Sequence, residues 1–230
     1  MKKDAKYFES IGKNFELWSD DYDVQQRRKL FSRLFLASGV DIEGTKNSNA
    51  LEVGCGFGGM TEFFVQNLQN LTVMDISEEL SKATANRFGL DHMAADVTNL
   101  SDTENKWDII VSSECIEHSS NPQKALEEMY RSLNPGGLLI VSTPNSLWKP
   151  VLRLGQLVRL RRFNDKELFI SPKGARALID GLGGEVMYLD GCHFLPWQVP
   201  FVKPVLQLLD AHARKFYFLT INFGIVIKKK

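Results

Sequence analysis

The chain has 230 residues, of which 43% are apolar and 24% charged, the balance of an ordinary globular protein. Its 28 basic residues match its 28 acidic ones, so no overall positive field would recruit nucleic acid, and we expect no DNA partner. No apolar run reaches the roughly 20 residues of a membrane span, no signal peptide is recognisable, and the cysteines, Cys55, Cys115 and Cys192, are scattered, so we expect a cytoplasmic protein.

Strands and helices alternate along most of the chain. The first 45 residues are expected to form a helical cap, in which apolar side chains from Leu30 to Ala37 share one face of a helix. The alternation that follows favours an α/β protein with a mainly parallel sheet and helices on both faces. The expected strands are 50–53, 71–76, 92–97, 107–112, 138–142, 185–189 and 217–227, and the expected helices are 61–68, 77–88, 122–133 and 171–182.

A glycine-rich turn follows the first strand, with four glycines within six residues. Glycine lets the backbone bend at positive φ and touch a ligand, and the next helix aims its N–H groups over the turn. The spacing of Gly54, Gly56 and Gly59 fits the dinucleotide fingerprint, whereas Glu52, Gly54, Gly56 and Gly58 fit a pattern of an acidic residue followed by alternate glycines. The turn alone therefore leaves two cofactor classes open.

Four further markers stand in order after this turn. Asp75 ends the second strand, Asp96 and Val97 close the third, a Glu-x-x-Glu-His block at 114–118 follows the fourth, and an Asn-Pro-Gly-Gly turn at 134–137 precedes the fifth. With the glycine pattern, these markers resemble the small-molecule branch of the Rossmann-like S-adenosylmethionine-dependent methyltransferases, especially the ubiquinone-biosynthesis O-methyltransferases. A nicotinamide dehydrogenase has no reason to carry the last two markers.

The resemblance implies one methyltransferase domain over residues 1–230. It further implies a Rossmann-like sheet of seven strands, mainly parallel, whose last strand is antiparallel. Residues 146–168 and 192–216, parts of which break the alternation, would be insertions on the side of the methyl acceptor. The sequence indicates no oligomeric state.

The resemblance also assigns the S-adenosylmethionine site. Glu52 would face the methionine amino group, Asp75 would accept the ribose hydroxyls, and Asp96 would accept from the adenine amino group, with the Val97 N–H near the ring. Ile76 would pack on the adenine. Glu52 as a loop cap, Asp96 as a turn acid and Ile76 as a core residue remain alternatives. The full expected set is Glu52, Gly54, Cys55, Gly56, Gly58, Asp75, Ile76, Asp96 and Val97.

The block after the fourth strand carries the expected chemistry. Glu114, Glu117 and His118 lie where ligands bind in such folds, and they could hold Mg²⁺, which prefers carboxylates and water. A cation would lower the pKa of an acceptor hydroxyl. Without metal, His118 would be the general base. His193 could be a fourth ligand, although a lone histidine between Cys192 and an aromatic residue is more often packed.

The acceptor is expected to be small and fairly apolar, with its oxygen methylated. Residues 147–163 carry five cations and no acid among apolar side chains, and 194–202 are apolar and aromatic. These stretches favour a lipid-like acceptor and peripheral membrane contact, with a lid packed on the domain as the alternative. Methylation of nitrogen or carbon, methylation of RNA ribose, and a cofactor-binding protein without catalysis also stay open.

Overall fold

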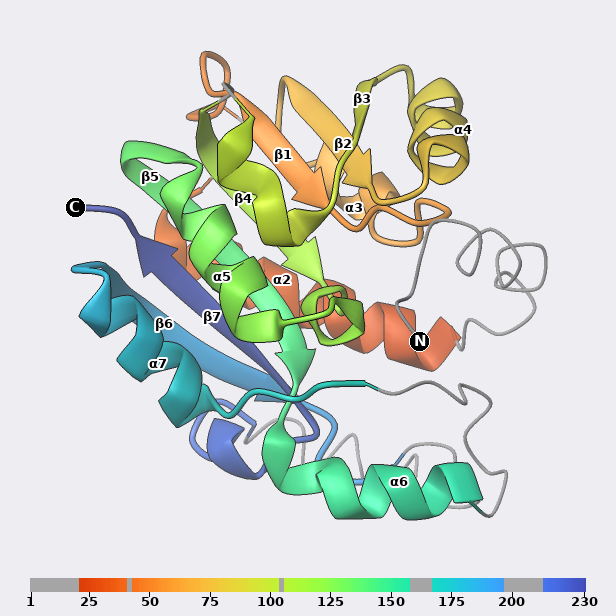
Figure 1. Cartoon of the computed structure of the whole chain (residues 1–230), viewed down its shortest axis with the longest axis vertical. Helices are drawn as coiled ribbons and strands as arrows, with labels where there is room; N and C mark the ends of the chain where they lie inside the picture. The colour runs from red at the N-terminus through yellow and green to blue at the C-terminus, as the bar shows by residue number, and fades with distance from the viewer. Residues whose placement is uncertain (1–20, 41–42, 104–105, 158–166, 197–212) are drawn as a thin grey trace.

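The computed structural model describes residues 21–40, 43–103, 106–157, 167–196 and 213–230. Its centre is a seven-stranded sheet in the order β3-β2-β1-β4-β5-β7-β6 (Figure 1). β7 runs antiparallel to both of its neighbours, and the pairs from β3 to β5 are parallel, which confirms the predicted sheet. The strands are β1 (Ala50–Val53), β2 (Leu71–Asp75), β3 (Asp91–Ala94), β4 (Trp107–Ser113), β5 (Leu133–Pro144), β6 (Glu185–Cys192) and β7 (Asn222–Lys228).

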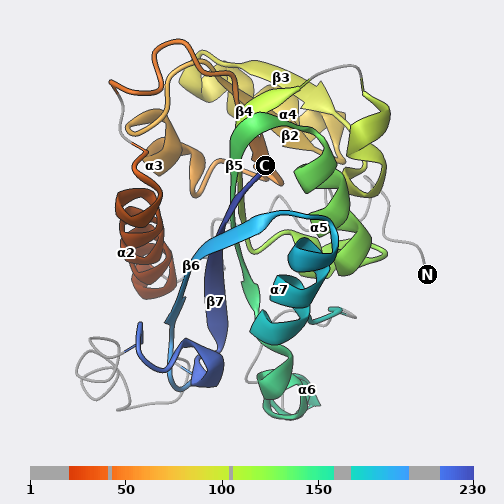
Figure 2. The same ribbon diagram turned by 90° about the vertical axis from the view of Figure 1, so that its left-hand side faces the viewer.

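Helices cover both faces of the sheet. Figure 2 shows α2 (Asp21–Ser38) and α3 (Thr61–Val65) on one side and α5 (Pro122–Arg131) and α7 (Pro172–Gly181) on the other. Each side has its own apolar core, because alternate strand residues point to opposite faces. α4 (Glu78–Phe88) packs against β2 and β3.

The helix predicted near the N-terminus is longer than its apolar pattern indicated. Leu30, Phe31, Leu34 and Phe35 are buried as predicted. The helix nevertheless already includes Asp21, because its earlier turns bury polar groups whose periodicity a hydrophobic pattern does not report. The remainder of the predicted cap, residues 1–20, lies outside the described part of the chain.

Several predicted boundaries were wrong by a few residues. α3 ends at Val65 rather than 68, and β3 ends at Ala94, after which Val97–Asp102 forms a 3₁₀ helix. The Asn-Pro-Gly-Gly turn is a bulge within β5, where four residues lie opposite one residue of β4. β7 begins at Asn222 rather than 217. Local hydrogen bonds decided these ends, whereas apolar runs predicted them.

A side chain caps the start of α4. Ser77 precedes α4 in an extended conformation, and its hydroxyl accepts a hydrogen bond from the Leu80 N–H at 3.3 Å. Two glutamates in the first turn complement the positive end of the helix dipole. These contacts fix the start of α4 at the edge of the sheet where β2 ends.

The insertion after β5 is partly described. A 3₁₀ turn leads into α6 (Lys149–Leu157), on which Leu152 is buried whereas Val151 and Leu154 are exposed. Residues 158–166, which include three of the predicted cations, and residues 197–212 of the second insertion lie outside the described residues. Within the described ranges, no helix is long and apolar enough to cross a membrane.

Candidate functional site

The glycine turn after β1 needs glycine for two different reasons. Gly54, Gly56 and Gly58 all have positive φ, at 80°, 50° and 82°. A Cβ on Gly54 would lie 2.3 Å from the Cys115 sulfur, and one on Gly58 would lie 2.7 Å from the Phe88 ring, so these two serve internal packing. A Cβ on Gly56 would meet nothing within 4 Å. Of the three glycines with positive φ, Gly56 alone presents open space at the turn, a distinction that the pattern did not reveal.

Asp75 ties this turn to β2. Its Oδ2 accepts a hydrogen bond from the Gly56 N–H and its Oδ1 accepts one from the Ser77 N–H, both at 3.0 Å. Burial raises the pKa of Asp75, and these N–H donors oppose the rise. Each carboxylate oxygen can accept a second hydrogen bond, so Asp75 keeps acceptor capacity at the edge of the sheet.

Glu52 is an acid placed inside the fold. Its side chain is 2% exposed, and its Oε2 accepts a hydrogen bond from the Thr61 hydroxyl at 2.7 Å. Burial raises the pKa of Glu52 to about 8, with a further contribution from the nearby Asp75. Glu52 is therefore mostly protonated at neutral pH, and a bound cation would favour its ionised form.

Asp96 and its neighbours form a short capped turn. Its Oδ1 accepts a hydrogen bond from the Thr98 N–H at 2.9 Å and one from the Thr98 hydroxyl at 2.7 Å. These are the bonds expected if Asp96 stabilises a turn, which was its alternative interpretation. Val97 is buried, and Ile76 is half-buried beyond the end of β2. Ile76 and Asp96 follow the ends of two adjacent strands, at the same edge of the sheet as the glycine turn.

Glu114 is held in a strained position just after β4. Its φ of 51° is unusual for a residue with a side chain, and such strain gathers at functional sites. The Ser142 hydroxyl donates to its Oε1 at 2.8 Å, and the Asn222 amide donates to its Oε2. Burial raises the pKa of Glu114 to about 7, although the positive charge of Arg27 opposes the rise.

Glu117 and His118 differ in exposure. The Glu117 carboxyl is buried and accepts from the Thr143 hydroxyl at 3.0 Å. Burial raises its pKa well above the ordinary range, and repulsion by Glu114 adds to this. The His118 side chain is 23% exposed, and its Nε2 lies 3.9 Å from Glu117 Oε1. His118 is thus the member of the block that an acceptor can reach most easily.

The described residues do not form the predicted Mg²⁺ site. Among them, no group of three or more His, Cys, Asp or Glu side chains is placed to hold a metal ion. Glu114 is engaged by Ser142 and Asn222, and Glu117 turns into the fold toward Thr143. These carboxyl groups instead accept hydrogen bonds from donors on β5 and β7.

His193 is a packed residue, as its alternative interpretation held. It is fully buried with φ of 60°, and its Nε2 lies 3.1 Å from Oδ1 of Asp23 in α2. Burial opposes ionisation of Asp23, but Arg27 and His193 outweigh it and hold the pKa of Asp23 below its ordinary value. The proposed fourth metal ligand is therefore part of a polar contact between α2 and the end of β6.

Sequence reasoning missed the residues that position the Glu-x-x-Glu-His block. Ser142 and Thr143 lie near the end of β5, and Asn222 opens β7, so they meet Glu114 and Glu117 only through the sheet pairing. The polar residues that end the apolar fifth strand could have drawn attention to Ser142 and Thr143. Nothing in the sequence around Asn222 indicated its contact with Glu114.

Comparison with known proteins decides the family. A model of the methyltransferase domain matches residues 22–185. The chain belongs to this methyltransferase family. It is 23% identical over 237 residues to the ubiquinone/menaquinone biosynthesis C-methyltransferase UbiE of Hydrogenovibrio crunogenus, covering 98% of this chain and 87% of the relative. It is 25% identical over 167 residues to the ubiquinone biosynthesis O-methyltransferase of Coxiella burnetii, covering 68% and 71%.

Solved structures share the fold of this methyltransferase. The N-methyltransferase NodS of Bradyrhizobium japonicum in complex with S-adenosylhomocysteine matches with a TM-score of 0.58 at 20% identity, over 89% of this chain and 86% of that one. The protein is an S-adenosylmethionine-dependent methyltransferase. The names of its relatives and of this neighbour include carbon, oxygen and nitrogen methylation, so the acceptor atom is a separate question.

Proposed function

We propose that the enzyme transfers a methyl group to an oxygen of a small, fairly apolar acceptor. One observation carries this proposal: the partly exposed His118 lies beside the buried Glu117 at the edge where β4 ends, with Glu114 fixed in a strained backbone conformation. A neutral histidine can take the proton of a hydroxyl group, whose pKa near 10 for a phenol makes proton removal worthwhile.

The cofactor would lie over the ends of β1, β2 and β3. The open side of Gly56 leaves room for it, Asp75 keeps acceptor capacity for the ribose, and Glu52 would meet the methionine amino group. Asp96 and Val97 would then border the adenine. Support comes from the common edge on which these residues lie, together with the solved neighbour that binds S-adenosylhomocysteine.

S-adenosylmethionine supplies an electrophilic methyl group on its sulfonium. Within the protein, His118 would hold the acceptor hydroxyl and take its proton, and Glu114 would orient the acceptor through its fixed carboxyl. Asn222 and Ser142 keep that carboxyl in place, so it is pre-organised before the acceptor arrives. Most of the rate would come from this positioning, because in-line attack depends on alignment.

The acceptor side suits a lipid-like molecule at a membrane surface. Leu147 is 56% exposed and Leu154 59%, and Phe218 and Leu219 are exposed on the segment before β7. The Trp148 indole N–H donates to the Leu219 carbonyl at 2.8 Å, which joins the two segments. We propose a cytoplasmic enzyme that touches the membrane through this surface, with cations of α6 facing anionic headgroups.

A methyl-transfer assay tests the proposed chemistry. Label from [methyl-³H]S-adenosylmethionine should pass into the organic phase of a lipid extract when wild-type enzyme is added. His118→Ala should lower this rate by about 10²–10⁴-fold while keeping the affinity for S-adenosylhomocysteine. His92→Ala is the matched control, because His92 is an exposed histidine on β3, and its rate should equal that of the wild type.

The product decides between the remaining alternatives. A base-stable, acid-stable methyl ether supports oxygen methylation, whereas a new carbon–methyl or nitrogen–methyl bond would contradict it. Cofactor binding without turnover on lipid, RNA or small-molecule fractions would favour a cofactor-binding protein without catalysis. An unchanged rate in His118→Ala would remove His118 as the base.

A further inference from the structure

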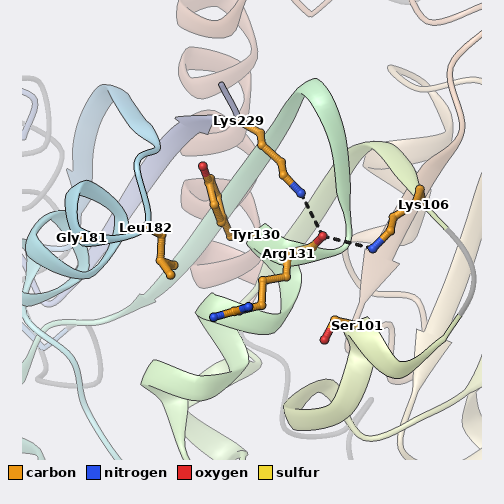
Figure 3. A pocket seen from close by; sticks show the side chains of 7 residues that line it. All are labelled: Ser101, Lys106, Tyr130, Arg131, Gly181, Leu182 and Lys229. Atoms are coloured by element: carbon orange, nitrogen blue, oxygen red, sulfur yellow. Dashed lines mark hydrogen bonds between the residues drawn. The ribbon is translucent and has the colours of Figure 1, made fainter.

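A cavity lies at the edge of the sheet opposite the glycine turn, and Figure 3 shows the side chains that line it. It has a volume of about 630 Å³. Lys106 precedes β4, Lys229 follows β7 and Arg131 ends α5, so the cavity opens where the parallel strands begin. Its lining is Ser101, Lys106, Tyr130, Arg131, Gly181, Leu182 and Lys229, and none of these belongs to the proposed catalytic site.

The two lysines converge on one carbonyl group. Lys229 Nζ donates to the Arg131 carbonyl at 2.9 Å and to the Leu133 carbonyl at 2.7 Å, and Lys106 Nζ donates to the same Arg131 carbonyl at 3.3 Å. These bonds complement the negative end of α5. An ammonium group has three N–H donors, so the bonds use two from Lys229 and one from Lys106.

Among the residues that the structure describes, no carboxylate lines the cavity between these cations. Glu127 binds the Arg131 guanidinium from the exposed side of α5, and Glu128 accepts from both the N–H and the hydroxyl of Ser101. Burial lowers the pKa of Lys229, and the positive charges of Lys106 and Arg131 lower it further. The cations therefore repel one another at short range, and an anion placed among them would relieve that repulsion.

We propose that this cavity, the basic pocket, binds the phosphoryl group of an anionic ligand. Two ammonium groups and a guanidinium group favour a dianion over a monocarboxylate, because they offer several charge-assisted donors around one centre. The Tyr130 ring and Leu182 give the pocket an apolar wall for the part of the ligand that carries the phosphate. This inference stands apart from the proposed methyl transfer and does not depend on it.

Inorganic pyrophosphate is a direct probe of the basic pocket. A calorimetric titration of the wild-type protein with pyrophosphate, at constant ionic strength, should show saturable binding at one site. Lys106→Gln should weaken this binding at least tenfold, and because Lys106 is exposed the variant should fold normally. The double variant with Lys229→Gln should abolish it. Lys82→Gln, an exposed lysine on α4, is the matched control and should bind as the wild type does.

The ligand could be a soluble phosphate compound or a lipid headgroup, so a second arm uses vesicles. Saturable binding of pyrophosphate identifies a soluble source, and binding only to phosphatidic-acid vesicles, lost in Lys106→Gln, identifies a headgroup. Binding of neither probe overturns the proposal. Equal weakening by Lys106→Gln and Lys82→Gln also overturns it, because the effect would then be one of net charge.

Discussion

The buried acid Glu52 should release a proton when the cofactor product binds. Its pKa of about 8 lies far above the ordinary 4.5 because burial and the nearby Asp75 raise it, against the opposing hydrogen bond from Thr61. If the S-adenosylhomocysteine amino group lies against it, the positive charge favours the carboxylate. Binding must then release the proton from the Glu52 carboxyl, so the affinity for S-adenosylhomocysteine should rise with pH.

The size of the effect follows from the pKa. With a pKa of about 8, roughly 0.9 of the Glu52 carboxyls are protonated at pH 7 and roughly 0.1 at pH 9. Binding should therefore release close to one proton at pH 7 and little at pH 9. The affinity should rise about tenfold between these values, because one pKa unit corresponds to about 1.4 kcal/mol.

The raised pKa of Glu52 also makes the free energy of unfolding depend on pH. Between about pH 4.5 and pH 8 the folded protein holds a proton on Glu52 that the unfolded chain has lost. The contribution of Glu52 to the free energy of unfolding is therefore greatest below this window and falls as pH rises through it. Glu52→Gln keeps the acceptor for Thr61 and should remove that fall.

Calorimetry in buffers of different ionisation enthalpy measures the released protons. Wild-type protein and Glu52→Gln would be titrated with S-adenosylhomocysteine at pH 7 and pH 9. Glu78→Gln, an exposed glutamate on α4, is the control for net charge and should behave as the wild type. A proton count near zero at pH 7, or the same count in Glu52→Gln, would refute the proposed contact with the amino group.

Three further perturbations test separate parts of the structure. Gly54→Ala should lower the melting temperature sharply, because at positive φ the new Cβ meets both the sulfur and the Cβ of Cys115. Adding Cys115→Gly, which removes both atoms, should restore part of the loss, and no recovery would reject the packing role. Asn222→Ala should lower the methyl-transfer rate about tenfold with unchanged S-adenosylhomocysteine affinity, and a lost affinity would instead indicate a cofactor contact. Co-sedimentation with anionic vesicles at low salt should fall when Val151 and Leu154 are changed to Ser; if wild-type protein ignores such vesicles, the surface is a lid.

The order of elements could be predicted from the sequence because each strand is a short apolar run followed by a turn or a cap. The buried face of α2 was predicted correctly for the same reason, since it depends on neighbours in the chain. The extension of α2 back to Asp21 could not be read from apolar periodicity, because part of its packing is the polar contact of Asp23 with His193.

The sequence predicted those residues of the candidate site that lie at strand ends, but not the partners that contact them. The positions of Glu52, Asp75 and Glu114 follow from strand ends, which the sequence marks. The partners of Glu114 do not, because Ser142 and Asn222 are brought to it by pairing of distant strands. The described residues give the Mg²⁺ prediction no support: the Glu-x-x-Glu-His block indicated a metal, but Glu114 and Glu117 accept hydrogen bonds from donors on other strands.

Binding of S-adenosylhomocysteine tests most directly the claim that the cofactor lies at the edge formed by Gly56 and Asp75. Calorimetry should show that it binds to the wild type while NADH does not, and that Asp75→Ala weakens it at least tenfold, the loss expected for hydrogen bonds to a charged group. Asp91→Ala, an exposed aspartate on the edge strand β3, should bind as the wild type does. Tight binding of NADH without binding of S-adenosylhomocysteine, or unchanged affinity in Asp75→Ala, would contradict the account.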